Sequence, residues 1–252
     1  MTDVLTTQNS AWTSAAAILF DLDGVLTPTA TVHEQAWKEL FEDFLASRPE
    51  VPGYREEDYF DHIDGKPRFD GVRDFLASRG IVLPEGSEDT DATTGAGDKQ
   101  AGNTVQGLGN RKNQVFNDIV GAGVEPFAGS VRFLEAALER GLKVAVVSSS
   151  RNAPAVLKAA GLNGHFEIVV DGVVAAAEGL PGKPSPATYT YAAQLLGLRS
   201  EECVVVEDAV SGVQAGSAGS FHSVIGVDRG AGRQALLDAG ATLVVNDLQE
   251  LL

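Results

Sequence analysis

The stretch "AILFDLDGVLTPT", residues 17–29, joins an apolar run to two acidic residues. Residues 17–20 are apolar, and Asp21, Asp23 and Gly24 follow at once. A short apolar run bounded by polar residues and glycine is typical of a buried strand. Side chains at positions i and i+2 of an extended chain point the same way. The stretch therefore predicts a strand that delivers the carboxylates of Asp21 and Asp23 to one ligand.

Similar apolar runs recur in the second half of the chain, rich in Val and Ile and with little alternation. They lie at residues 143–150, 166–172, 203–212, 222–228 and 241–245. Continuous runs of this kind are typical of parallel strands that are buried on both faces. Helical patterns lie between them, for example at residues 130–141 and 185–197. The alternation predicts an α/β fold with a doubly wound, Rossmann-like parallel sheet.

Residues 28–125 have a different pattern, with amphipathic helices at 33–45 and 68–80 and no buried strand. We expect an α-helical cap domain to be inserted here, after the first strand. The catalytic core would then consist of residues 1–27 and 126–252. Within the insertion, residues 85–103 are rich in Gly, Asp and Thr, which favours an exposed loop.

The chain is acidic, with a formal net charge of −16 over 252 residues. An acidic surface repels the phosphates of nucleic acids and anionic lipids, so we expect neither as a partner. The apolar runs are far shorter than the roughly 20 residues of a membrane helix. The polar N-terminus lacks the basic and apolar regions of a signal peptide. These features predict a cytoplasmic protein, and we expect a monomer.

In an open parallel sheet, the ligand site lies beyond the carboxyl ends of the strands. The polar residues that end the apolar runs should therefore converge, joined by a lysine that precedes a helix: Asp21, Asp23, Ser148, Ser149, Ser150, Lys183, Glu207 and Asp208. A few carboxylates suit Mg²⁺, and lysine and serine side chains bind phosphate. With a metal bound, one carboxylate can attack phosphorus while a second gives a proton to the leaving oxygen.

The order of these motifs resembles the haloacid dehalogenase (HAD) superfamily. "DLDGV", a serine after a later strand, Lys-Pro and "VEDAVSGVQAG" occur in sequence between residues 18 and 216. The resemblance implies that Asp21 is a nucleophile that becomes an aspartyl phosphate, and that Asp23 is the acid/base. It implies that Ser148 and Lys183 hold the transferring phosphoryl group. It also implies an Mg²⁺ site formed by Asp21, the carbonyl of Asp23, and the pair of acids at positions 207 and 208.

The insertion resembles the cap of the β-phosphoglucomutase branch of this superfamily. The opening "DLDGVLTPTATVHEQAWKELF" is similar to that branch, and so are "GKPRFDGV", "RKN" at 111–113 and "SSSRNAP". The resemblance implies substrate-binding roles for eight residues: Thr29, His33, Arg68, Lys112, Ser149, Ser150, Arg151 and Asn152. Two cap cations, Arg68 and Lys112, would hold the phosphate that does not react.

Three functions remain open at this point. The first is a mutase that interconverts β-D-glucose 1-phosphate and glucose 6-phosphate through a bisphosphate. The second is a sugar-phosphate phosphatase, which needs only that water attack the phosphoenzyme. The third, from another class, is a non-catalytic phosphate-binding module. Both enzymes would use Mg²⁺ and a phosphorylated sugar.

Overall fold

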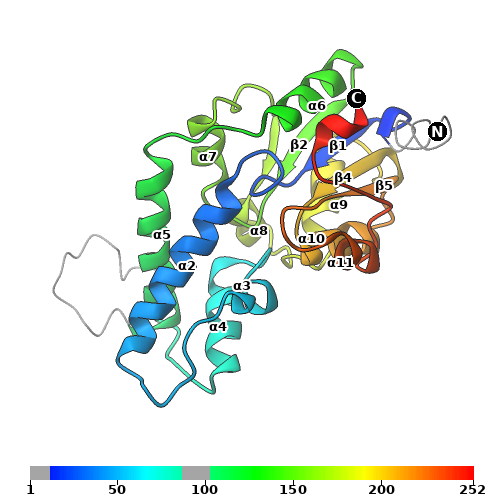
Figure 1. The fold of residues 1–252 in the computed structure, drawn as a ribbon. Helices are drawn as coiled ribbons and strands as arrows, with labels where there is room; N and C mark the ends of the chain where they lie inside the picture. Colours follow the sequence, from blue (N-terminus) through cyan, green and yellow to red (C-terminus); the bar gives the residue numbers. More distant parts are fainter. Residues whose placement is uncertain (1–11, 87–102) are drawn as a thin grey trace. The chain divides into compact units, whose positions relative to one another are not determined.

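The computed structural model describes residues 12–86 and 103–252. Within these ranges the strands form one six-stranded sheet in the order β3-β2-β1-β4-β5-β6, in which every pairing is parallel (Figure 1). The strands are β1 Ala17–Phe20, β2 Lys143–Val147, β3 Ile168–Val170, β4 Cys203–Glu207, β5 Ser223–Val227 and β6 Leu243–Val245. The predicted α/β fold with a parallel sheet is confirmed.

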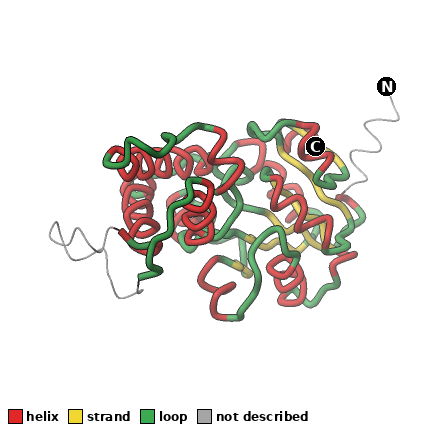
Figure 2. The backbone as a smooth tube through the Cα atoms, turned by 90° about the horizontal axis from the view of Figure 1, so that it is seen from below, coloured by secondary structure: helices red, strands yellow, loops and turns green. Residues whose placement is uncertain are grey.

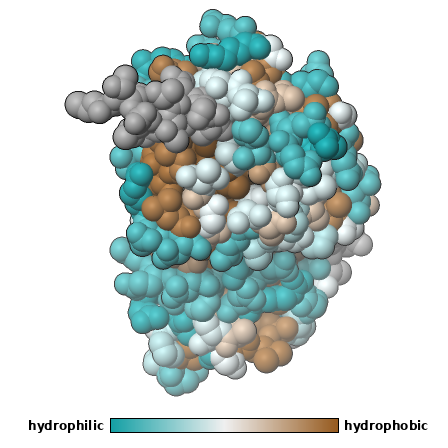
Figure 3. Space-filling view, turned by 90° about the vertical axis from the view of Figure 1, so that its right-hand side faces the viewer, coloured by the Kyte–Doolittle hydropathy of each residue, from teal (hydrophilic) through white to brown (hydrophobic). Residues whose placement is uncertain are grey.

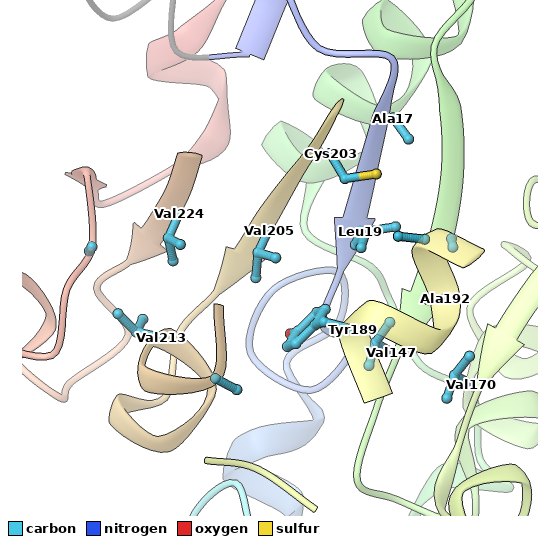
Figure 4. Close-up of a cluster of buried hydrophobic side chains, with 14 of the residues drawn as sticks. Ala17, Leu19, Val147, Val170, Tyr189, Ala192, Cys203, Val205, Val213 and Val224 are labelled. Carbon is cyan, nitrogen blue, oxygen red and sulfur yellow. The ribbon is translucent and has the colours of Figure 1, made fainter. Parts of the chain in front are cut away.

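Helices cover both faces of this sheet. They are α6 Ala128–Glu139, α7 Ala153–Ala159, α8 Gly172–Ala177, α9 Ala187–Leu195, α10 Val210–Ala218 and α11 Arg233–Asp238, with the short 3-10 helices η2 Ser200–Glu202 and η3 Leu248–Leu251. Figure 2 draws the strands in yellow among these red helices. On one face, Leu19 and Val205 pack with Tyr189 and other residues of α9 (Figure 4). On the other, the ring of Phe20 lies 6.1 Å from that of Phe133 in α6. Burial on both faces explains why the strands read as continuous apolar runs.

The chain divides into two compact units. The core unit comprises Met1–Thr29 and Val124–Leu252, and the helical unit comprises Ala30–Gly123. The helical unit contains most of α2 Thr29–Ala46, together with α3 Glu57–His62, α4 Arg68–Ser78 and α5 Val105–Val120. In the part of residues 28–125 that the structure describes, there is no strand of the sheet.

Aromatic side chains form the core of the helical unit. The rings of Phe41 in α2 and Phe75 in α4 stack with centroids 3.7 Å apart. Beside them, Asp58 is fully buried and forms an ion pair with Arg79. The interior is thus an apolar cluster with one charge-paired acid on α3.

The strands are shorter than the apolar runs that predicted them. Run 143–150 ends as a strand at Val147, and run 203–212 ends at Glu207, after which α10 begins at Val210. Local side-chain hydrogen bonds turn the chain at both points: the Ser148 hydroxyl accepts from the Ser150 N–H, and the Glu207 carboxylate accepts from the next two N–H groups. Most of the expected loop at 85–103 lies outside the described residues.

Within the described ranges, every helix is too short or too polar to cross a membrane. The face of the molecule drawn in Figure 3 is mainly hydrophilic, and polar side chains interrupt its apolar areas.

Candidate active site

The central strand β1 places the first two acidic residues. Because β1 pairs with β2 on one side and β4 on the other, its carboxyl end is level with theirs. The N–H of Asp21 continues this pairing and donates to the carbonyl of Val206 (2.9 Å). Leu22, between the two aspartates, is fully buried, whereas Asp23 is half-buried. β1 itself ends at Phe20, so both acids lie in the segment that directly follows the strand.

Lys183 joins the carboxyl ends of three strands. Its Nζ donates to Oδ1 of Asp21 (2.5 Å), to Oε1 of Glu207 (2.6 Å) and to the carbonyl oxygen of Val147 (3.2 Å). An ammonium has three N–H groups, so these three acceptors use them all. The lysine side chain is only 2% exposed. Burial disfavours its charge, but the two carboxylates outweigh this effect and raise the pKa of Lys183.

Glu207, at the end of β4, is held by four donors. Its Oε1 accepts from Lys183 and from the hydroxyl of Tyr189 (2.8 Å). Its Oε2 accepts from the backbone N–H groups of Asp208 (3.1 Å) and Ala209 (3.2 Å). The carboxylate lies over Gly212 of α10, where any Cβ would overlap it. Glu207 is thus fixed in one position, and its four lone-pair directions already face protein donors.

Three of the predicted acids come together. Ligand oxygens of Asp21, Glu207 and Asp208 all lie within 4.8 Å of one another. A Cβ on Gly24 would overlap the carboxylate of Asp208, so this acid reaches the β1 loop only because residue 24 is glycine. Burial raises the pKa of Asp21, while Lys183 opposes that rise. Three neighbouring carboxylates, two of which contact Lys183, leave a negative excess that an oxygen-binding cation such as Mg²⁺ would neutralise. The donor set fits such an ion.

Asp23 has different surroundings from Asp21. Its Oδ1 accepts from the hydroxyl of Thr29 (2.5 Å), and its Oδ2 accepts from the hydroxyl of Ser148 (3.2 Å). Ser148 follows β2 and is buried, and its own oxygen accepts from the N–H of Ser150 (3.0 Å). Two aspartates that are two residues apart therefore differ in partners: a lysine holds one, and hydroxyl groups hold the other.

The remaining serine-loop residues lie between β2 and α7. Ser149, Ser150, Arg151 and Asn152 are all half-buried. The hydroxyl of Ser150 accepts from the N–H of Asn152 (3.1 Å). The loop is therefore ordered by its own hydrogen bonds.

In the helical unit, the structure brings His33 and Lys112 together. The ammonium of Lys112 contacts Nδ1 of His33, and the histidine ring stacks on Phe116 at 3.9 Å. An ammonium can only donate, so Nδ1 accepts and a neutral His33 carries its proton on Nε2. The other predicted cation, Arg68, donates to Oδ1 of Asn113 (2.7 Å), the residue after Lys112.

Three residues whose side chains bind to Glu207 or to the opening motif were not singled out by the sequence. Tyr189 binds Glu207, and its position within a helical pattern gives no sign of that role. Thr27 binds the hydroxyl of Thr29 (2.7 Å) and lies in the opening motif itself. Arg229 donates from Nε to the carbonyl of Gly24 (3.0 Å). Arg229 comes just after the apolar run 222–228, so its position beyond a strand end could have predicted that it lies near the site.

Comparisons with known proteins agree with this arrangement. A family model described as haloacid dehalogenase-like hydrolase matches residues 15–219. A β-phosphoglucomutase of Mycobacterium tuberculosis is 48% identical over 246 residues, covering 94% of this chain and 91% of that protein. A β-phosphoglucomutase of Bacillus subtilis is 32% identical over 238 residues, covering 93% and 91%.

A crystal structure of β-phosphoglucomutase from Clostridium difficile has a TM-score of 0.72 and covers 94% of this chain and 93% of that one. At 23% identity, this likeness shows the fold alone. The family match and the two relatives set aside the non-catalytic alternative. The chain belongs to the haloacid dehalogenase-like hydrolase family and is an enzyme, either a phosphotransferase or a phosphatase.

Proposed function

We propose that this enzyme interconverts β-D-glucose 1-phosphate and glucose 6-phosphate. The observation that carries the proposal is the different environment of the two aspartates in the opening motif. Asp21 is buried beside Lys183 and near Glu207 and Asp208, whereas Asp23 is held by hydroxyl groups. The names of relatives at 48% and 32% identity support the sugar.

Asp21 is the nucleophile in this proposal. One of its carboxylate oxygens forms a bond to phosphorus as the bond from phosphorus to the sugar oxygen breaks. Lys183 holds Oδ1 of Asp21 and is placed to offset the negative charge of the phosphoryl group. Ser148 is close enough to Asp23 to bind a phosphoryl oxygen beside it. The product of this step is an aspartyl phosphate.

Asp23 moves the proton. In its protonated form it gives a proton to the sugar oxygen that leaves phosphorus. In the reverse step it takes a proton from the hydroxyl that attacks the aspartyl phosphate. If that hydroxyl belongs to the bound sugar phosphate, the product is a bisphosphate. When the bisphosphate returns its other phosphate to Asp21, the isomerised monophosphate is released.

Asp21, Asp208 and the carbonyl of Asp23 would hold Mg²⁺, with Glu207 as the more distant acid. This order follows from the four donors that already surround the carboxylate of Glu207. When bound, the ion neutralises the phosphoryl oxygens during the transfer.

We assign the helical unit to the predicted cap and to recognition of the sugar phosphate. Arg68 and Lys112 would bind the phosphate that does not react, and His33 would bind a sugar or phosphate oxygen through Nε2. Thr29, Ser149, Ser150, Arg151 and Asn152 would complete the substrate contacts. On an acidic chain, two cap cations are a specific means of binding a second phosphate.

A sugar-phosphate phosphatase is the alternative, because water can replace the sugar hydroxyl in the second step. Phosphorus NMR distinguishes the two functions. The enzyme is mixed with β-glucose 1-phosphate, Mg²⁺ and a trace of glucose 1,6-bisphosphate. We expect glucose 6-phosphate to accumulate. If inorganic phosphate accumulates instead, the chain is a phosphatase and the mutase proposal is wrong.

A further inference from the structure

Two buried threonines connect the acid/base Asp23 to the backbone of its own loop. The hydroxyl of Thr29 contacts Oδ1 of Asp23 at 2.5 Å, and the hydroxyl of Thr27 contacts that of Thr29 at 2.7 Å. The hydroxyl of Thr27 also lies 3.3 Å from the carbonyl oxygen of Leu22. Both threonines are at most 1% exposed. Four oxygens therefore form one chain, in which the two hydroxyl groups are buried.

The number of protons fixes the direction of this chain. A hydroxyl has one proton to donate, and an ionised carboxylate can only accept. Thr29 therefore gives its proton to Asp23, and its oxygen accepts from Thr27. The proton of Thr27 is then committed to Thr29, which agrees with the longer contact to Leu22.

We propose that Thr27 is a positioning residue, whose hydroxyl acts through Thr29 to fix the orientation of the Asp23 carboxyl group. This inference rests on the proposed acid/base role of Asp23. A hydroxyl that accepts one hydrogen bond donates a stronger one, so Thr27 strengthens the bond from Thr29 to Asp23. Without Thr27, the oxygen of Thr29 would lose its buried donor.

The same four oxygens can also form a hydrogen-bonded chain when Asp23 is protonated. Its O–H would donate to Thr29, Thr29 would donate to Thr27, and Thr27 would donate to the carbonyl of Leu22. In this state each of the two hydroxyl groups would donate once and accept once. The carbonyl of Leu22 thus ends the chain in this direction, so the chain can hold Asp23 with or without a proton on Oδ1.

The backbone of Thr27 is held independently of its hydroxyl. Its N–H donates to the carbonyl of Leu22 (3.1 Å), and its carbonyl accepts from the N–H of Gly24 (2.7 Å). Thr27→Val keeps this backbone and the shape of the side chain but removes the hydroxyl. Thr27→Ser keeps the hydroxyl. Thr188→Val is a matched control, since Thr188 is another buried threonine whose hydroxyl has no hydrogen-bond partner.

The experiment compares two leaving groups in a single turnover with enzyme in excess. The sugar oxygen of β-glucose 1-phosphate needs a proton to leave, whereas 4-nitrophenolate leaves without one. For Thr27→Val we expect release of glucose to slow by about tenfold, the effect of roughly one hydrogen bond. The rate of 4-nitrophenolate release by Thr27→Val should differ from that of the wild type by less than about twofold. Thr27→Ser and Thr188→Val should behave as wild type with both esters.

Asp23→Asn separates the two ideas that this experiment tests. If Asp23 is the acid, its variant should slow release of the sugar by about 100-fold or more and spare 4-nitrophenolate. Suppose that Asp23→Asn slows release of the sugar alone. If Thr27→Val then slows both esters equally, or slows neither, the inference about Thr27 is wrong. Equal loss in Thr27→Ser would also overturn it. Should Asp23→Asn slow both esters equally, the acid role is wrong, and the inference falls with it.

Discussion

Replacement of Lys183 by methionine removes the cation that holds two buried carboxylates and keeps most of the side-chain volume. The exposed fractions of the three side chains are 2% for Lys183, 9% for Asp21 and 1% for Glu207. Loss of one partner from a buried ion pair costs about 3–5 kcal/mol, chiefly because a charge is left unpaired. Glu207 retains Tyr189 and two backbone donors, which favours the lower end of that range.

We therefore expect Lys183→Met to lower the free energy of unfolding by about 3 kcal/mol at pH 8 without Mg²⁺. For a chain of this size, that is a fall in Tm of about 6–12 °C. The cost should shrink as the pH falls through the pKa of Asp21, which burial raises above its usual range, because a protonated carboxyl needs no cation. Added Mg²⁺ should restore part of the lost stability in the variant.

Tryptophan fluorescence can follow this change in the core unit. The chain has two tryptophans, Trp12 in the core unit and Trp37 in the helical unit, so a Trp37→Phe background leaves Trp12 as the reporter. The matched variant is Lys183→Met with Glu207→Gln, which removes one of the two unpaired charges. It should be more stable than Lys183→Met alone. If the two substitutions only add their separate costs, the charge argument is refuted.

Three further expectations follow from the same network and from the helical unit. Asp208→Ala should weaken Mg²⁺ binding in calorimetry much more than Glu207→Gln, because the donors around Glu207 leave it little capacity to coordinate; equal losses would place both acids on the ion. Burial alone would raise the pKa of Asp58, but hydrogen bonds from Arg79 and the backbone of Arg55 outweigh burial and lower it. The ionised Asp58 should therefore stabilise the fold above the unfolded-state pKa of about 4, and this stabilisation should be lost as the pH falls below it. In acid unfolding curves, Asp58→Asn should not show this loss. Arg68→Ala should lower kcat/KM for the sugar phosphate by about 10- to 150-fold, the effect of one charged hydrogen bond, while phosphorylation of Asp21 by acetyl phosphate changes little; a parallel fall in both would make Arg68 structural.

The sequence predicted the part of the fold that depends on local patterns. The Val- and Ile-rich runs located the strands, and their polar ends identified the acids and the serine that meet at one edge of the sheet. The lysine was identified by its position just before a helix. The ends of the strands were less predictable. At Ser148 and Glu207, side chains accept hydrogen bonds from nearby N–H groups and turn the chain. The amino-acid sequence alone does not distinguish such a serine or glutamate from a residue of the preceding strand.

The contacts that arise from tertiary packing could not be predicted. Tyr189 points at Glu207 because α9 packs across the sheet, and the helical pattern around it is equally consistent with a tyrosine in the apolar core. The contact between Lys112 and His33 likewise depends on how α2 and α5 pack. Spacing shows which residues share a strand end, whereas hydrogen-bond partners depend on the packing of elements distant in sequence.

If Asp21 carries the phosphoryl group during the reaction, that group can be trapped on its side chain and located. The enzyme is mixed with Mg²⁺ and glucose 1,6-bisphosphate, quenched in acid within one turnover, and reduced with borohydride, which converts an aspartyl phosphate to homoserine. Peptide mass spectrometry then locates the change. We expect homoserine at position 21 in the wild type, and none in Asp21→Asn. Homoserine at position 23, or a phosphoryl group retained on another residue with Asp21 unmodified, would contradict this expectation.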